Sequence, residues 1–163
     1  WIMADLTYTA NGTFRRNATE AVPGNGIAYS KKTLISTVEV AVGAANRTYK
    51  LAKIPSRARI CASSTVYWDD LATAGAPTLD IGLASVDSNI TSDADAINDG
   101  LALSSAGSNR VVKDIANIGK QAWEYVNGQT TDPGGDLDVY VSVLDASTTT
   151  AGTVSLEFDY IVD

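Results

Sequence analysis

Two stretches near the C-terminal end of the chain alternate strictly between apolar and polar residues. Residues 137–143 place leucine or valine at every second position, and residues 154–162 do the same with valine, leucine, phenylalanine and tyrosine. A period of two over this length predicts β-strands with one buried face. The segment between them is rich in Thr, Ser, Ala and Gly, which favours a chain reversal. We therefore predict an antiparallel hairpin with Val141, Leu156 and Phe158 buried, for which every upstream strand supplies partners.

The same alternation continues upstream, between short segments rich in turn-forming residues. It predicts strands over residues 34–42, 47–54, 59–68 and 78–86. Helix signals prevail only in residues 87–100, where Asp93 is a candidate N-cap and Gly100 a candidate C-cap of a helix of one or two turns. Residues 111–118 and 122–126 are interpreted as further strands. About eight short strands with one short helix favour an all-β fold, an antiparallel, jelly-roll-like β-sandwich.

The first part of the chain does not share this periodicity. Residues 1–32 are polar and are interrupted by Asn11-Gly12, Pro23 and Gly24 to Gly26, which break regular elements. We therefore predict an extended N-terminal arm over residues 1–32 and a single β-sandwich domain over residues 33–163. A length of 163 residues with 45% hydrophobic residues suits one domain. No apolar run approaches the ~20 residues that cross a bilayer, so we expect a soluble protein without a membrane partner.

Charge is divided unevenly along the chain, whose net charge is −7. Residues 1–60 hold nine Lys or Arg against three Asp or Glu, a balance of +6, and residues 61–163 hold three against sixteen, a balance of −13. Such asymmetry would let a basic end lie on an acidic body, its own or that of a neighbour. Ordinary surface charge beside strands explains it equally well.

The arm holds the candidate residues for contact with a neighbouring molecule. They are one aromatic and four basic residues: Phe14, Arg15, Arg16, Lys31 and Lys32. Phe14 would anchor the arm and the basic residues would add attraction at low ionic strength. The basic residues are too sparse, and lack the aromatic pattern, for a nucleic-acid partner. A loosely ordered tail is the alternative interpretation.

The sequence contains no histidine and one cysteine, which excludes several kinds of catalytic and metal site. Ser-His-Asp and Cys-His nucleophile systems, His-ligated zinc and Cys-rich metal sites are all ruled out. A carboxylate glycosidase would need a facing pair such as Glu124 with Glu157 or Asp159. Acids that alternate along strands usually form the solvated face, so we expect no enzyme activity.

A run of acidic residues suggests a cation site. It consists of Asp87, Asp93, Asp95, Asn98 and Asp99. Hard cations need several oxygen ligands from one loop, but Ile97 and Asn98 stand where a calcium loop requires a ligand and a glycine. Capping of a short helix is the competing explanation. We expect neither a metal nor a cofactor.

Four aromatic residues form a possible contact surface. Tyr67, Trp68, Trp123 and Tyr125 would suit stacking on a sugar, although aromatic residues on strands more often lie in a core or an interface. Adjacent Tyr67 and Trp68 must point to opposite faces. Trp68 and Trp123 are taken as the candidate exposed aromatic contacts.

Four short motifs resemble, in their order, a group of tailed-bacteriophage virion proteins. Residues 51–60, Leu-Ala-Lys-Ile-Pro-Ser-Arg-Ala-Arg-Ile, are similar to an Ile-Pro-x-x-Ala-x-Ile segment that joins two strands in that group. Residues 79–83, the Asp-rich residues 93–101 and the closing residues 137–162 follow in the same order. The resemblance covers roughly residues 34–163.

The resembling proteins are small β-sandwich proteins of the capsid exterior, called decoration, cement or head-stabilising proteins, and related head or tail components. The resemblance implies a virion structural protein without enzyme activity, on the capsid exterior after synthesis in the host bacterial cytoplasm. The implied partners are the major capsid protein and further copies of the chain in a homotrimer. Residues 1–32 lie outside the resemblance, so a docking role for them rests on charge alone. A carbohydrate-binding module or adhesin-like tail component stays open as an alternative.

Overall fold

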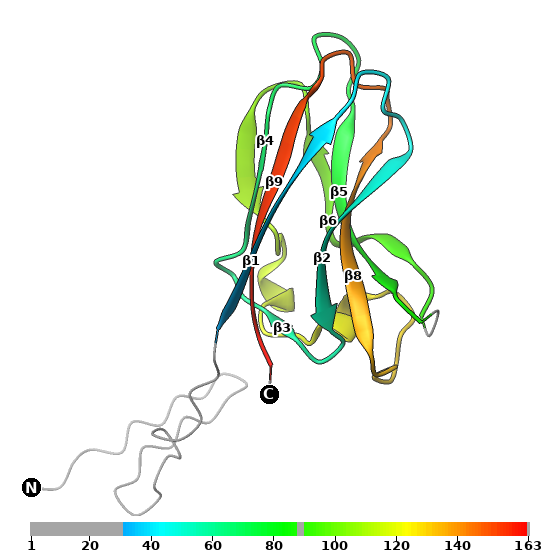
Figure 1. Ribbon diagram of the computed structural model, residues 1–163. Helices are drawn as coiled ribbons and strands as arrows, with labels where there is room; N and C mark the ends of the chain where they lie inside the picture. The colour runs from blue at the N-terminus through cyan, green and yellow to red at the C-terminus, as the bar shows by residue number, and fades with distance from the viewer. Residues whose placement is uncertain (1–30, 88–89, 163) are drawn as a thin grey trace, which may run out of the picture.

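Two antiparallel β-sheets pack face to face in the computed structural model, which describes residues 31–87 and 90–162 (Figure 1). Sheet A has the strand order β1 (Lys32–Val40), β9 (Gly152–Ile161), β4 (Thr65–Trp68) and β7 (Gly107–Arg110), with β3 (Arg59–Ile60) also paired to β9. Sheet B has the order β2 (Arg47–Pro55), β8 (Asp136–Leu144), β5 (Thr78–Ser85) and β6 (Asp93–Ala102). Two short 3-10 helices, η1 (Ile115–Asn117) and η2 (Ala122–Tyr125), lie between β7 and β8.

The strand order is that of a jelly roll. β1 and β2, β4 and β5, β6 and β7, and β8 and β9 are neighbours in the chain but lie in opposite sheets. The chain therefore crosses repeatedly between the layers, while β5 and β6 pair within sheet B. The apolar faces of both sheets meet in one core. The predicted all-β antiparallel sandwich is confirmed.

The predicted hairpin is wrong in its pairing, although its two strands and their buried faces are right. β8 lies between β2 and β5, whereas β9 lies between β1 and β4 in the other sheet. Val141 and Phe158 are fully buried and Leu156 is 1% exposed, because the two strands face each other across the core. The loop between them packs on the β1–β2 turn: the Thr148 hydroxyl donates to the Ala41 carbonyl at 2.7 Å. A loop of small polar residues fits an arch between sheets as well as a hairpin.

Residues 93–100, predicted as a short helix, lie in β6. β6 pairs with β5 through two irregularities in register, and Asn98 is buried. Gly100, the expected C-cap, has a φ of +74° and donates its N–H to Asp80 Oδ1 at 2.8 Å. The helix prediction was wrong because tertiary pairing with β5 outweighs local helix signals.

Residues 111–118 and 122–126, predicted as strands, contain η1 and η2 instead. The Asp114 carboxylate caps η1, and the first main-chain N–H groups of η2 donate to the carbonyls of Ser56 and Ala58. These bonds fasten the segment across one end of the sandwich, so its main chain is not available for a sheet ladder. Within the described residues, no helix has the length and apolar character required to span a membrane.

The single strand predicted over residues 59–68 is divided into β3 and β4. Between them the buried Ser64 hydroxyl donates to the Asp159 carbonyl at 3.0 Å, and the Asp159 N–H donates to the Ser64 hydroxyl at 2.9 Å. This side chain therefore takes the place of a main-chain partner for β9 and interrupts the strand.

Candidate functional site

One end of the sandwich collects segments that are far apart in the sequence. β1 begins there, β9 finishes there, and β3 pairs with the last residues of β9 (Figure 1). η2 covers the same end through its bonds to the chain between β2 and β3, and η1 is joined to η2 by the Tyr125 hydroxyl, which donates to the Asn117 carbonyl. We call this the terminal end. Because residues 1–30 join the described chain at Lys31, it is also the end from which the predicted arm starts.

An exposed apolar turn marks the terminal end. Ile115 is 83% exposed, the largest value among the large hydrophobic residues described, and Ile118 is 44% exposed. Residues three apart in a 3-10 helix lie on the same side, so the two isoleucines form one small surface. The sequence did not indicate this surface because a strand over residues 111–118 would have buried one side.

Four bonds hold this turn in one conformation. The Tyr125 hydroxyl donates to the Asn117 carbonyl at 2.6 Å, and Lys120 Nζ donates to Asn117 Oδ1 at 2.7 Å. Arg59 donates to the Gly119 carbonyl at 2.6 Å, and Asp114 provides the cap. An apolar surface ordered in advance loses little conformational entropy when it binds, which suits a contact site.

Lys31 is attached to the body of the domain. Its Nζ lies 2.8 Å from Asp159 Oδ2, and the hydroxyls of Ser63 and Thr33 also donate to this carboxylate. Asp159 is 2% exposed, so the pair is enclosed on the carboxylate side. Lys32 is exposed at the start of β1. The other arm candidates, Phe14, Arg15 and Arg16, lie outside the described residues, and the contact roles of all five stay predictions.

We expect Asp159→Asn to lower the free energy of unfolding at neutral pH by about 2 kcal/mol, because three donors face the carboxylate and an amide nitrogen cannot accept from them. Lys31, Ser63 and Thr33 lower the pKa of Asp159 to about 2. The unfolded value is about 3.9. Because the folded pKa is depressed, this stabilisation is complete above roughly pH 4 and is lost as the pH falls toward 2.

Urea denaturation of both proteins at about pH 7 and about pH 2.5 measures this difference. The exposed Asp136 provides a matched control, and Asp136→Asn should change stability little at either pH. Equal losses for Asp159→Asn at the two pH values would contradict the role assigned to the ionised carboxylate.

The candidate aromatic residues do not form one platform. Trp68 lies opposite Val154 at the start of β9, whereas Trp123 lies at the terminal end. Both are partly buried against the core, and each indole N–H donates within the protein, to the Ser105 carbonyl at 2.9 Å and to Gln121 Oε1 at 2.7 Å. Contact roles for Trp68 and Trp123 stay predictions. Tyr67, which precedes Trp68 in the chain, is the more exposed ring, with 46% exposure.

The carboxylates considered for catalysis have structural partners. Glu124 accepts the Gln121 N–H at 2.6 Å in the capping box of η2. Asp159 is held by Lys31 and two hydroxyls, and Glu157 lies on the outer face of sheet A between Ile35 and Thr65. The three come from different surroundings, and the structure does not place them as a facing pair across a cleft.

The acidic run also does not converge. Asp93 accepts the Asn127 N–H at 2.7 Å, while buried Asn98 donates to the carbonyls of Arg110 and Val111. Burial raises the pKa of Asp93, with a further contribution from neighbouring Asp95. Across residues 31–87 and 90–162, no three acidic or cysteine side chains are grouped closely enough to hold a metal ion.

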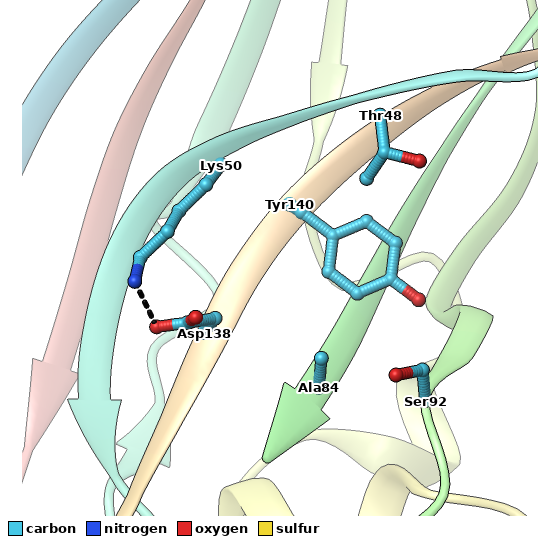
Figure 2. A pocket seen from close by; sticks show the side chains of 6 residues that line it. All are labelled: Thr48, Lys50, Ala84, Ser92, Asp138 and Tyr140. Atoms are coloured by element: carbon cyan, nitrogen blue, oxygen red, sulfur yellow. Dashed lines mark ion pairs between the residues drawn. The ribbon is translucent and has the colours of Figure 1, made fainter. Parts of the chain in front are cut away.

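A shallow groove of about 280 Å³ lies on the outer face of sheet B (Figure 2). It is lined by Thr48, Lys50, Ala84, Ser92, Asp138 and Tyr140. Lys50 Nζ and Asp138 Oδ1 form an ion pair of 2.6 Å on one side, and the Tyr140 hydroxyl is directed toward Ser92 on the other. The volume lies just below the ~300–1,000 Å³ of ligand pockets. With Tyr140 only 7% exposed, its ring is too covered to stack on a sugar.

Comparisons with known proteins give structural neighbours only. No protein-family model and no curated protein sequence matches the chain. A chain of the Cyanophage Pam1 capsid asymmetric unit is similar in structure with a TM-score of 0.54 and 20% identity, over 94% of this chain and 100% of that chain. A chain in the capsid of Ralstonia phage GP4 has a TM-score of 0.53 and 18% identity, over 81% of this chain and 85% of that chain.

At these identities the comparisons establish a shared fold. The chain has the same β-sandwich as a component of each of the two phage capsids. The resemblance to phage virion proteins seen in the sequence motifs is therefore confirmed at the level of fold.

Proposed function

We propose that this chain is a bacteriophage virion structural protein, a decoration or cement protein that binds the capsid exterior and stabilises the head. One observation carries the proposal: a chain of the Pam1 capsid matches this sandwich over its whole length. In that capsid the sandwich is thus a component by itself rather than a domain of a larger chain. The structural bonds of Glu124 and Asp159 agree with a protein that binds rather than catalyses.

The terminal end is the surface we assign to the major capsid protein. It presents Ile115 and Ile118 on a turn held by the Tyr125–Asn117 bond, and it contains Lys31, to which residues 1–30 are joined in the chain. The apolar turn and the basic arm would contribute to capsid binding in different ways. The turn gives affinity because its isoleucines are buried on binding, and the arm gives a longer reach and an electrostatic attraction to the capsid. Copies of the chain associate as a homotrimer in this proposal, and the protein reaches the capsid exterior after synthesis in the host bacterial cytoplasm.

Capsid shells of the encoding phage, assembled without this chain, provide the test. We expect the wild-type protein to co-sediment with the shells, and Ile115→Asp with Ile118→Asp to weaken binding at least tenfold. Burial of an isoleucine contributes about 1.5–3 kcal/mol, and about 1.4 kcal/mol corresponds to tenfold in affinity. Removal of residues 1–30, which keeps the Lys31–Asp159 pair, should weaken binding mainly at low ionic strength.

Val42→Asp is the matched control, because Val42 is 59% exposed in the turn after β1, at the opposite end of the sandwich. It should bind as the wild type does. Loss of binding by Val42→Asp, with the isoleucine variant unaffected, would place the docking surface at the opposite end. Failure of the wild-type protein to bind shells, together with virions unlabelled by an antibody to the chain, would reject the function itself.

A further inference from the structure

The two edge strands of sheet B carry opposite charges. β2 contains Arg47, Lys50 and Lys53 and no acidic residue, which gives it a charge of +3. β6 contains Asp93, Asp95 and Asp99 and no basic residue, which gives it a charge of −3. β2 and β6 lie at the two ends of the strand order, with β8 and β5 between them. The charge difference between the first and second parts of the sequence therefore becomes a charge difference between the two edges of sheet B.

Most of these charges are available for a partner. Arg47 and Lys53 are exposed and form no ion pair with any residue in the described ranges, and Lys50 stays 52% exposed beside Asp138. On β6, Asp95 and Asp99 are exposed. The nearby Lys113 donates to the main-chain oxygen of Asp99 rather than to its carboxylate.

The two edges cannot meet within one molecule. Three inter-strand spacings of about 4.8 Å separate β2 from β6, so the complement of each edge belongs to another molecule. A two-fold contact of β2 with β2, or of β6 with β6, would bring like charges together, and such contacts are disfavoured. A head-to-tail contact brings opposite charges together, and its repetition forms a closed ring when the rotation between successive copies closes.

The strand directions agree with this arrangement. Successive strands of sheet B are antiparallel, so β2 and β6 run in opposite directions. In a ring whose axis follows the strands, β6 of one copy lies antiparallel beside β2 of the next. Both strands contain register irregularities, which interrupt a continuous main-chain ladder and leave contact to the side chains.

We propose that β2 of one copy lies against β6 of the next, head to tail, and that this charged contact is the subunit interface of the symmetric oligomer. The inference rests on the proposed function for the presence of an oligomer and adds the surfaces that form it. Several exposed charges together select the partner and its orientation, whereas each pair alone contributes little.

Charge reversal with rescue tests the interface on the purified full chain by size exclusion with light scattering. Arg47→Glu with Lys53→Glu, and separately Asp95→Lys with Asp99→Lys, should each weaken association at least tenfold. All four substitutions in one chain should restore an oligomer of wild-type mass, because both edges are then reversed. Wild-type association should weaken as salt rises from about 0.02 M to about 0.5 M.

Glu39→Lys, at an exposed position on the β1 edge of sheet A, is the control that should leave association unchanged. Three results would each overturn the proposal. The wild-type protein could be a monomer at about 100 µM and low salt, either of the two double variants could associate as the wild type does, or the fourfold variant could fail to restore the oligomer. Because these measurements contain no capsid, they fail independently of the shell-binding assay. Circular dichroism confirms that each variant is folded.

Discussion

Phe158→Ala is expected to lower the free energy of unfolding by about 3–5 kcal/mol, as large-to-small substitutions of buried aromatic residues do. Phe158 is fully buried in β9, lies opposite Leu34 of β1, and has its ring centroid 6.4 Å from that of Tyr160. Because β9 is paired on both sides, its neighbours cannot collapse freely into the cavity. Urea denaturation at one fixed protein concentration measures the loss.

Ile35→Ala is the control in the same sheet. Ile35 is 77% exposed on the outward face of β1, so its removal should change stability by less than about 0.5 kcal/mol. A loss below about 1 kcal/mol for Phe158→Ala would contradict the assignment of the β9 faces.

Gly82→Ala is expected to be the second strongly destabilising change, by about 3 kcal/mol, the upper part of the range for overpacking. Leu83 pairs with Asp93 and Ile81 pairs with Asn98, so residues 94–97 form a bulge in β6 opposite Gly82. A Cβ on Gly82 would lie 2.3 Å from the Asp93 carbonyl oxygen and 2.6 Å from that of Ala94. Main-chain atoms cannot rotate away, so β6 must shift.

Ala84→Ser tests the same face of β5, two residues along, at a half-buried position where a Cβ is already present. It should change stability little, while Gly82→Ala should also reduce hydrogen-exchange protection in β6. Protection and stability equal to wild type in Gly82→Ala would show that β6 does not approach β5 as closely as described.

Strand faces could be predicted from the sequence because burial imposes a period of two on each strand separately. Leu79, Ile81 and Leu83 were expected to face inward, and all three are fully buried. Pairing could not be predicted in the same way. The loop after β8 has a composition that suits a hairpin or an arch. Long-range contacts distinguish the two, among them those of Thr148 with the β1–β2 turn and of Thr149 with the Leu71 carbonyl. Residues 93–100 likewise gained their conformation from β5 rather than from their own propensity.

The candidate site was predictable only in part. Lys31 was identified from its charge, but its partner Asp159 lies 128 positions away and is brought near by the pairing of β1 with β9. Ile115 and Ile118 were assigned to a strand because their apolar character fits one. Their exposure follows from the bonds of η2 to the carbonyls of Ser56 and Ala58 and from the bond that Arg59 donates to the Gly119 carbonyl, which have no counterpart in the local sequence.

The position of β8 and β9 at the centres of opposite sheets has a consequence for synthesis. Leu34 cannot pair before Phe158 has been synthesised, and β2 cannot pair before β8 has been synthesised. Each sheet therefore lacks one of its inner strands until β8 and β9 have been made. At 5–20 residues per second, about 5–20 s pass between the synthesis of residues 32 and 136. During that time only β5 with β6 and β4 with β7 have their partners. Apolar strands made early therefore remain exposed on the ribosome, and the cell that makes this protein must protect nascent chains from aggregation until the last two strands emerge.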